Sequence, residues 1–270
     1  MLLEKNILNF NFLEKICTIA IKAGGEVMDV YNKDFEVLEK TKNHPITEAD
    51  IKSHSIIKNS LFGLLENTYF LSEESEIIDW NIRKKWERYW LVDPLDGTKE
   101  FVNKNGEFTV NIALIENHIP ILGVIYAPSI DMIYLACRGL GSFSKKLESG
   151  EKKFNINKNL RLKVSSFKKK ERLKMLSSRS HRNNEKMNNW LKFQKEHTIK
   201  YMGSSLKFCL IADGSADIYP RFRPTSEWDI AAGHCILKEA GGSIKTLDGN
   251  EIEYNKKESF LNPDFIASNF

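Results

Sequence analysis

The sequence has no long hydrophobic run, and its first residues do not lead us to expect a secretory signal. A membrane-spanning helix needs about 18 consecutive apolar residues or more, and no apolar stretch approaches that length. The N-terminal segment MLLEKNILNF mixes Glu4, Asn6 and Asn9 with apolar side chains, whereas a signal has a basic region followed by a clean apolar stretch. We therefore expect a protein of the cytoplasm.

Cysteine is scarce and is not spaced as a metal ligand. The four cysteines, Cys17, Cys137, Cys209 and Cys235, form no Cys-x-x-Cys pair, and each lies in an apolar segment. We expect buried thiols in a reducing compartment. The chain also has no internal repeat, no flexible linker and no low-complexity tract.

Excess charge is small as well. A net charge of +4 is too low to predict binding to nucleic acid, but it is compatible with a small anionic substrate. What the chain does contain is 41% hydrophobic and 11% aromatic residues, which excludes intrinsic disorder. Its 270 residues allow one large domain or two closely packed ones, with a core that needs no disulfide or metal.

Two helices are expected near the N-terminus. Apolar side chains recur at steps of four and three along residues 7–31, which predicts one long helix. Gly24 and Gly25 inside it indicate close approach by another backbone segment. A second helix is expected over residues 47–66, because a threonine and an aspartate three residues apart form a capping box at its start. The two capping residues are Thr47 and Asp50.

Strands dominate the middle of the chain and alternate with helices afterwards. The first β-rich runs are 69–72, 89–93, 108–116, 121–128 and 132–137, of which the last three predict an antiparallel meander. After a lysine-rich stretch at 145–174, strands are expected at 175–178, 198–202, 216–222, 242–246 and 264–268. Helices are expected at 184–195, 204–212 and 229–240. We divide the chain into halves, 1–145 and 146–270, of one compact catalytic unit.

The most informative segment is WLVDPLDGTKEF, where a hydrophobic strand ends in two aspartates. Pro94 fixes one dihedral angle and Gly97 permits a tight turn, so Asp93 and Asp96 can converge on one point. Hard carboxylate oxygens suit Mg²⁺, and a substrate phosphate would complete its shell. The alternative is an ordinary surface turn.

Further acidic residues stand at the ends of other elements. Glu73 and Glu74 follow a strand directly, which is electrostatically costly without a nearby cation, although a solvated pair in a loop is the alternative. Asp229 precedes or opens a helix, where it could be an N-cap or meet metal and phosphate at the positive helix end. Asp50 is either a capping residue only or also a carboxylate that accepts a proton through the Thr98 hydroxyl.

These segments together resemble a known family. ITEAD (46–50), LSEES (71–75), DPLDGTKEF (93–101) and EWDIAAG (227–233) occur in the order and spacing of the inositol monophosphatase superfamily of Mg²⁺-dependent, lithium-sensitive phosphatases. The strings NGEFTVNIALIE, GVIYAP, SSLKFC, YPRF and ESFLNP resemble one branch of it, the CysQ-type 3'(2'),5'-bisphosphate nucleotidases. The resemblance runs from about residue 15 to the C-terminus and implies a layered α-β-α-β-α sandwich.

The resemblance implies a metal site and a hydrolytic mechanism. Two or more Mg²⁺ ions would be held by Glu73, Asp93, Asp96, Asp229 and the carbonyl of Leu95. Thr98, paired with Asp50, would orient the attacking water and accept its proton, while Glu74 would support these ligands or bind a weaker additional metal. The phosphate would lie against Leu95, Asp96, Gly97, Thr98 and Asp229.

Four residues of the second half would bind the nucleotide and its second phosphate by the same resemblance: His181, Ser204, Lys207 and Arg221. Each has a structural alternative. His181 would otherwise lie in a surface loop, and Ser204 would cap a helix. Lys207 would lie on a solvated helix face, and Arg221 would form a structural ion pair.

The implied reaction removes the 3'-phosphate of adenosine 3',5'-bisphosphate to give AMP, with the sulfated analogue PAPS as a further substrate, in sulfur assimilation. The alternatives are an inositol-1-phosphate phosphatase and, from another class, a non-catalytic nucleotide sensor. No nucleic acid polymer is expected as a partner, and the oligomeric state stays open. The lysine-rich segment 145–174 is either a solvated face or a site of weak peripheral contact with the cytoplasmic face of the inner membrane.

Overall fold

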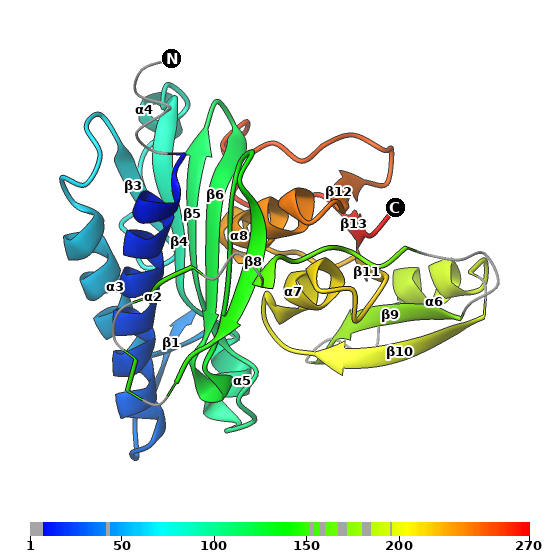
Figure 1. The fold of residues 1–270 in the computed structure, drawn as a ribbon, viewed down its shortest axis with the longest axis horizontal. Helices are drawn as coiled ribbons and strands as arrows, with labels where there is room; N and C mark the ends of the chain where they lie inside the picture. The colour runs from blue at the N-terminus through cyan, green and yellow to red at the C-terminus, as the bar shows by residue number, and fades with distance from the viewer. Residues whose placement is uncertain are drawn as a thin grey trace.

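The chain folds into five alternating layers of helix and sheet (Figure 1). A computed structural model describes residues 8–41, 44–148, 150–151, 154–156, 160–166, 172–179, 185–194 and 196–270. The helical layers are α2 (Phe10–Tyr31) with α3 (Glu48–Leu61), then α7 (Leu206–Ala212) with α8 (Glu227–Glu239), and finally α6 (Glu185–Leu191). A six-stranded and a five-stranded sheet separate these layers. The predicted α-β-α-β-α sandwich is confirmed.

The six-stranded sheet has the strand order β3-β4-β5-β6-β7-β8. Its strands are β3 (Tyr69–Ser72), β4 (Arg88–Asp96), β5 (Thr109–Glu116), β6 (Ile119–Ala127), β7 (Met132–Cys137) and β8 (Gly141–Lys146). Only β3 and β4 run parallel, and every other neighbouring pair is antiparallel. The meander β5-β6-β7 is therefore confirmed.

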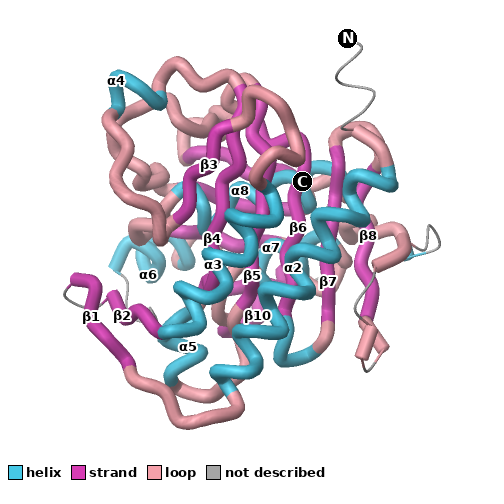
Figure 2. The backbone as a smooth tube through the Cα atoms, turned by 90° about the vertical axis from the view of Figure 1, so that its left-hand side faces the viewer, coloured by secondary structure: helices cyan, strands magenta, loops and turns pink. Residues whose placement is uncertain are grey.

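Both faces of this sheet are covered, which explains its nearly continuous hydrophobic strands. Along β4, Trp90 and Val92 belong to the core beneath α2 and α3, whereas Tyr89 and Leu91 belong to the core beneath α7 and α8. The alternation follows from the two-residue period of a strand. Figure 2 shows α2 and α3 side by side across the outer face of the sheet.

Helix α2 confirms the first predicted helix. Asn9 caps it by accepting a hydrogen bond from the Phe12 amide. A Cβ at position 24 would lie 2.5 Å from the Tyr126 ring, so Gly24 does mark close approach by the sheet. The same prediction is wrong for Gly25, because a Cβ there would meet nothing within 4 Å.

Helix α3 begins with the predicted capping box of Thr47 and Asp50. It ends at Leu61 instead of continuing to residue 66, because Phe62 adopts an extended conformation and Gly63 has a φ of 72°. The Ser53 hydroxyl donates to the Pro94 carbonyl oxygen over 2.8 Å. This bond fastens α3 to the end of β4, where the candidate site lies.

The five-stranded sheet has the strand order β10-β9-β11-β13-β12. Its strands are β9 (Leu173–Ser178), β10 (His197–Met202), β11 (Ile218–Arg221), β12 (Ser243–Thr246) and β13 (Phe265–Ser268), as predicted to within about two residues at each end. Among the described residues, six short elements were not predicted: β1 (Val37–Thr41), β2 (His44–Thr47), α4 (Trp80–Arg83), α5 (Thr98–Val102), the 3-10 helix η1 (Pro128–Ile130) and β8. Elements this short carry too few residues to show a hydrophobic period.

The remaining predictions about the chain concern its thiols, its membrane topology and its lysine-rich segment. All four cysteines are buried and unbridged, as expected. No helix among the described residues is long and apolar enough to span a bilayer. Much of the segment 145–174 lies outside the described residues. Within its described part, Lys145 pairs with Glu151 over 2.5 Å.

Candidate active site

The end of β4 places one aspartate on each side of a β-bulge. Asp93 pairs with Asn111 of β5 and Asp96 pairs with Thr109, with a shift of register between them. Pro94 and Leu95 lie opposite the single residue Val110, so β4 has one extra residue here, which bends the strand. The Asp93 carboxylate is almost completely buried and accepts a hydrogen bond from the Leu95 amide over 3.1 Å. The predicted convergence of the two aspartates is therefore a property of this bulge.

Asp96 contacts the second half of the chain directly. Its Oδ2 accepts a hydrogen bond from the Ser205 amide over 2.5 Å and another from Asn111 Nδ2 over 3.3 Å. The Ser205 hydroxyl bonds in turn to Thr109 Oγ1 and Asn111 Oδ1, each over 2.8 Å. A residue just before α7 is thus attached to both β4 and β5.

Gly97 and Thr98 turn the chain from β4 into α5. Gly97 has a φ of 92°, and a Cβ there would lie 2.9 Å from the Glu107 carbonyl oxygen, so only glycine fits. The Thr98 hydroxyl lies 3.5 Å from Asp50 Oδ1 and 3.2 Å from the Leu95 carbonyl oxygen. The predicted pairing of Thr98 with Asp50 is therefore present in the geometry.

Asp50 combines capping with this contact to Thr98. Its Oδ2 accepts hydrogen bonds from the amide and the hydroxyl of Thr47, both over 2.7 Å, while Oδ1 faces Thr98. Burial of the carboxyl raises its pKa to about 6, although the bonds from Thr47 oppose that shift. The capping role is therefore confirmed, and the same carboxylate lies within reach of the Thr98 hydroxyl.

Glu73 and Glu74 lie directly after β3, beside β4. The Glu73 amide donates to the Val92 carbonyl oxygen over 3.1 Å, which continues the parallel pairing of the two strands. The Glu74 amide donates to the Ser72 hydroxyl over 3.3 Å. Both side chains are half-buried, and Glu73 lines the main cavity. The alternative that Glu73 and Glu74 are a fully solvated pair in a loop is therefore wrong.

Asp229 lies in the first turn of α8 but is not its N-cap, which corrects that alternative. Ser226 is the N-cap, and Asp229 is its partner three residues later, accepting from the Ser226 amide over 2.9 Å. Burial, together with the neighbouring Asp96 carboxylate, raises the pKa of Asp229 to about 7. Its side chain lines the same cavity as Glu73.

The acidic residues at these element ends disfavour one another's ionisation. The pKa of Asp93 is raised well above its ordinary value, first by burial and then by Glu73, Asp96 and Asp229. Such a cluster of oxygen donors has the chemistry of a site for a hard cation. Within the ranges that the structure describes, however, no three acidic, histidine or cysteine side chains already enclose a position for a metal ion. The donors are gathered, but they do not form a closed coordination shell.

One cavity of about 620 Å³ joins this acidic cluster to a basic one. Its lining includes Glu73, Asp96, Thr98 and Asp229, which we call the acidic end, and Ser204, Lys207, Arg221 and Arg223, which we call the basic end. The two groups adjoin, because the Lys207 ammonium group is close enough to oppose the rise in the pKa of Asp96. Asp50, Asp93 and Leu95 stand behind this lining and are nearly inaccessible. The predicted residues therefore form one site, with some at the cavity surface and others beneath it.

Lys207 is buried, so its placement on a solvated helix face is excluded. Its ammonium group donates to the carbonyl oxygens of Met202 and Ser204 and lies 5.1 Å from the centre of the Tyr219 ring. Burial lowers its pKa to about 8, although Asp96 opposes the shift. Ser204 is not the helix cap, because it has a φ of 46° and Ser205 occupies that position.

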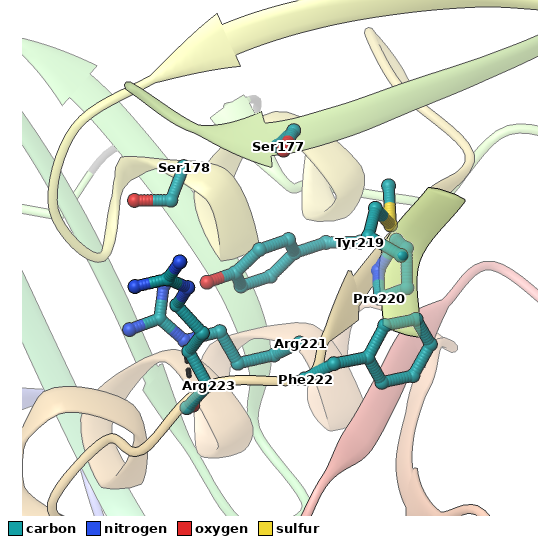
Figure 3. A pocket seen from close by; sticks show the side chains of 8 residues that line it. Ser177, Ser178, Tyr219, Pro220, Arg221, Phe222 and Arg223 are labelled. Atoms are coloured by element: carbon teal, nitrogen blue, oxygen red, sulfur yellow. Dashed lines mark hydrogen bonds between the residues drawn. The ribbon is translucent and has the colours of Figure 1, made fainter. Parts of the chain in front are cut away.

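Arg221 and Arg223 lie next to each other beside Tyr219 and Ser178 (Figure 3). Arg221 donates to the carbonyl oxygens of Arg223 and Pro224, each over 3.0 Å, so these carbonyls orient its guanidinium group. Arg223 is exposed and lines both this small pocket and the main cavity. The prediction for His181 falls outside the described residues.

Several residues of the site were not predicted from the sequence. Ser205 and Asn111 bind Asp96, and Glu107 binds both Arg179 and the Gly203 amide. Glu107, Asn111 and Ser205 lie within strings that carry the family resemblance, but nothing local assigns them a contact, because their partners are distant in sequence. Arg223 could have been suspected from its position two residues after Arg221 on an extended segment, where both arginines point to one face.

Comparisons with known proteins agree with this geometry. A sequence model described as the inositol monophosphatase family matches residues 10–269. The chain is 43% identical over 258 residues to the 3'(2'),5'-bisphosphate nucleotidase CysQ of Shigella flexneri, covering 95% of this chain and 99% of that protein. It is 46% identical to the protein of the same name from Buchnera aphidicola, covering 95% and 93%.

A solved structure shows the same likeness. The crystal structure of CysQ from Bacteroides thetaiotaomicron, described as a bacterial member of the inositol monophosphatase family, superposes with a TM-score of 0.83 at 36% identity. The match covers 97% of this chain and all of that one. With the family model spanning nearly the whole sequence, the chain belongs to the inositol monophosphatase family.

Proposed function

We propose that this protein is a metal-dependent 3'(2'),5'-bisphosphate nucleotidase. The observation that carries the proposal is a cavity whose lining combines carboxylates with Lys207, Arg221 and Arg223. A substrate with two phosphates can place one at each end. The relatives named CysQ support this choice, since they are similar over nearly their whole length.

The acidic end would hold the metal. We assign Glu73, Asp93, Asp96, Asp229 and the Leu95 carbonyl as its ligands, with Glu74 supporting them or binding an additional ion. All these donors are oxygens, the donor type that Mg²⁺ prefers, so we propose Mg²⁺, with two or more ions in the site. Burial raises the pKa of both Asp93 and Asp96, and the carboxylates of Glu73, Asp96 and Asp229 raise that of Asp93 further, so a bound cation would stabilise their ionised forms. Bound metal would polarise the phosphoryl group and lower the pKa of a water molecule.

Thr98 and Asp50 would handle the proton of the attacking water. The Thr98 hydroxyl, between Asp50 Oδ1 and the Leu95 carbonyl oxygen, orients the water. With a pKa of about 6, Asp50 is mostly ionised at neutral pH and can accept a proton through Thr98. The water oxygen bonds to phosphorus, the P–O ester bond breaks, and the leaving ribose oxygen keeps the electron pair and takes up a proton.

The phosphate that reacts would lie against Gly97 and Thr98, where α5 begins. The second phosphate would lie near Ser204, Lys207 and Arg221, and His181 remains a proposed contact from the sequence. Guanidinium groups bind phosphate through parallel hydrogen bonds, and the Arg221 group is already oriented by carbonyls. We keep the proposed halves, 1–145 with most of the metal ligands and 146–270 with the contacts of the second phosphate, and Asp229 adds a metal ligand from the second half.

The substrate we propose is adenosine 3',5'-bisphosphate, hydrolysed at its 3'-phosphate to AMP, with its sulfated analogue PAPS as a further substrate. A cytoplasmic location remains a prediction from the sequence. The direct test is phosphate release from adenosine 3',5'-bisphosphate with Mg²⁺ and with EDTA, together with chromatography of the nucleotide product. We expect Mg²⁺-dependent release and AMP that keeps its 5'-phosphate. Equal release in EDTA, or a product that keeps the 3'-phosphate, would disprove the proposal.

A further inference from the structure

Glu107, in the segment before β5, connects the six-stranded sheet to two segments of the second half. Its Oε2 accepts from Arg179 Nε over 2.6 Å, and its Oε1 accepts from an Arg179 terminal nitrogen over 2.5 Å. Oε2 also accepts from the Gly203 amide over 2.7 Å. We call the paired side chains the Glu107–Arg179 bridge. Bidentate, charge-assisted bonds of this kind have a defined geometry as well as strength.

The bridge lies where β9 and β10 both end. Arg179 directly follows β9, and it donates to the carbonyl oxygen of Tyr201 in β10 over 3.1 Å. Gly203 directly follows β10. A Cβ at Gly203 would lie 2.7 Å from both Glu100 Cγ and the Glu107 carbonyl oxygen. Residue 203 therefore packs so tightly against Glu100 and Glu107 that it has no room for a side chain. One carboxylate therefore holds the ends of two neighbouring strands.

The turn formed by residues 203–205 leads from this bridge to the cavity. Ser204 has a φ of 46°, a conformation that the surroundings must maintain because it is strained for a non-glycine residue. Ser205 donates its amide to Asp96, and the Lys207 ammonium group donates to the Ser204 carbonyl oxygen. The turn thus fixes Ser204 and Lys207 relative to the carboxylates, and Glu107 fixes one end of the turn.

We propose that Glu107 and Arg179 are positioning residues that hold the turn 203–205 and thereby set the affinity for the substrate. This inference rests on the proposed function, because the residues being positioned are those assigned to the second phosphate. Neither residue handles the reacting atoms. Their loss should therefore raise KM with little change in kcat, since Asn111 of β5 still binds Asp96 and since Thr98 and Asp50 contact neither residue.

A matched control stands at the opposite end of the same two strands. Arg172 directly precedes β9, Glu196 directly precedes β10, and the two side chains form an ion pair that is largely exposed. Arg172→Met therefore removes an arginine–glutamate pair from the same strands without touching the cavity. Arg179→Met removes the bridge, and Arg179→Lys retains the charge but not the bidentate geometry.

The first measurement is steady-state hydrolysis of adenosine 3',5'-bisphosphate with Mg²⁺. We expect Arg179→Met to raise KM about tenfold, corresponding to loss of one charge-assisted contact, while kcat stays within about twofold. Glu107→Ala should raise KM further, Arg179→Lys should lie between wild type and Arg179→Met, and Arg172→Met should match wild type. An equal KM for Arg179→Met and Arg172→Met, or a fall in kcat alone, would overturn the inference.

The second measurement is deuterium uptake of peptides that span residues 202–208, which needs no activity. The Gly203 amide donates to Glu107, so its exchange should accelerate in Glu107→Ala and, to a smaller extent, in Arg179→Met, but not in Arg172→Met. Unchanged exchange in Glu107→Ala would overturn the inference. Faster exchange with unchanged KM would do so too, because the turn would then not set affinity. If wild type itself releases no phosphate, the proposed function fails, whereas the exchange still reports whether the bridge holds the turn.

Discussion

The acidic and basic ends of the cavity are held in place by different kinds of structure. Asp93 and Asp96 lie on β4, a strand paired on both sides and buried over nearly its whole length. Ser204 lies in a turn whose amides are bound by the side chains of Glu107 and Asp96, and Lys207 follows that turn. Arg221 ends the short strand β11. The aspartates of the acidic end are thus held in place by backbone pairing. The residues of the basic end are held by contacts between residues that are distant in sequence.

This difference in how the two ends are held predicts how each should respond to substitution. A change at the acidic end removes a reactive group from a rigid strand, so the fold should survive while the reaction fails. A change at the basic end alters the position of a group that only binds, so affinity should change before the rate does. Substitutions at each end should therefore separate kcat from KM.

The largest effect is expected for Asp96→Asn. Removing one carboxylate from the cluster should lower kcat by about 10³-fold or more, because the charge that would hold the cation is lost. The amide oxygen can still accept from Ser205, and repulsion with Asp229 is relieved, so Tm should not fall. Asp264→Asn, at a surface ion pair with Lys186, is the control. Activity like that of wild type in Asp96→Asn would contradict the metal assignment.

A smaller loss is expected for Thr98→Ala, which keeps every carboxylate. Without the hydroxyl that faces Asp50, kcat should fall about 100-fold, in the range for loss of a positioned proton-transfer group. The Mg²⁺ concentration for half-maximal activity should change little, and Thr98→Ser should retain most of the rate. A collapse of Mg²⁺ affinity with the alanine variant would show that Thr98 serves the metal instead of the water.

The third prediction concerns α8, which carries Asp229 and packs on the six-stranded sheet. His234 of α8 is buried against Tyr254, and burial lowers its pKa from 6.5 to about 3. As the pH falls below 6.5, the unfolded chain protonates this histidine while the folded chain keeps it neutral. Proton binding therefore favours the unfolded state and lowers the free energy of unfolding. Relative to His234→Gln, wild type should lose about 2 kcal/mol of unfolding free energy between about pH 7 and about pH 5.

The comparison with His234→Gln is needed because other groups act in the opposite direction. The raised pKa values of Asp50, Glu227 and Asp229 favour proton uptake by the folded state in the same pH window. Both proteins share these groups, so the difference between their denaturation curves isolates His234. Parallel pH dependences would contradict its burial in the neutral form.

The smallest effect is expected for Lys207→Met at the basic end. The methionine keeps the buried stem beside Tyr219 but removes the charge. KM for adenosine 3',5'-bisphosphate should rise about tenfold, whereas KM for adenosine 3'-monophosphate should change little. Lys186→Met, on the surface helix α6, should change neither value. Equal increases for both substrates would exclude Lys207 as the contact of the second phosphate.

The sequence predicts the acidic end well because its residues lie in contiguous motifs. DPLDG contains the bulge, both aspartates and the glycine whose positive φ other residues rarely adopt. Thr47 and Asp50 form the capping box that predicts the start of α3. The long elements were predicted for a similar reason. Strands buried on both faces read as continuous hydrophobic runs, and α2 repeats its apolar face over 22 residues.

The basic end could be predicted only in part because its contacts join segments far apart in the chain. Ser205 binds Asp96 across 109 positions, and Arg179 binds Glu107 across 72. Local sequence also left Lys207 and Asp229 ambiguous. Only the packed structure shows that Lys207 is buried and that Ser226, not Asp229, caps α8.

The most direct test of the two-ended cavity is the ratio of kcat/KM for adenosine 3',5'-bisphosphate to kcat/KM for inositol 1-phosphate, measured with Mg²⁺ in one preparation. Both substrates offer a phosphate to the acidic end, and only the first offers another to Lys207 and Arg221. We predict a ratio of about 100 or more, because a second charge-assisted phosphate contact adds about 2 to 3 kcal/mol. A ratio near or below one would contradict the role of the basic end and leave only a phosphatase of other specificity.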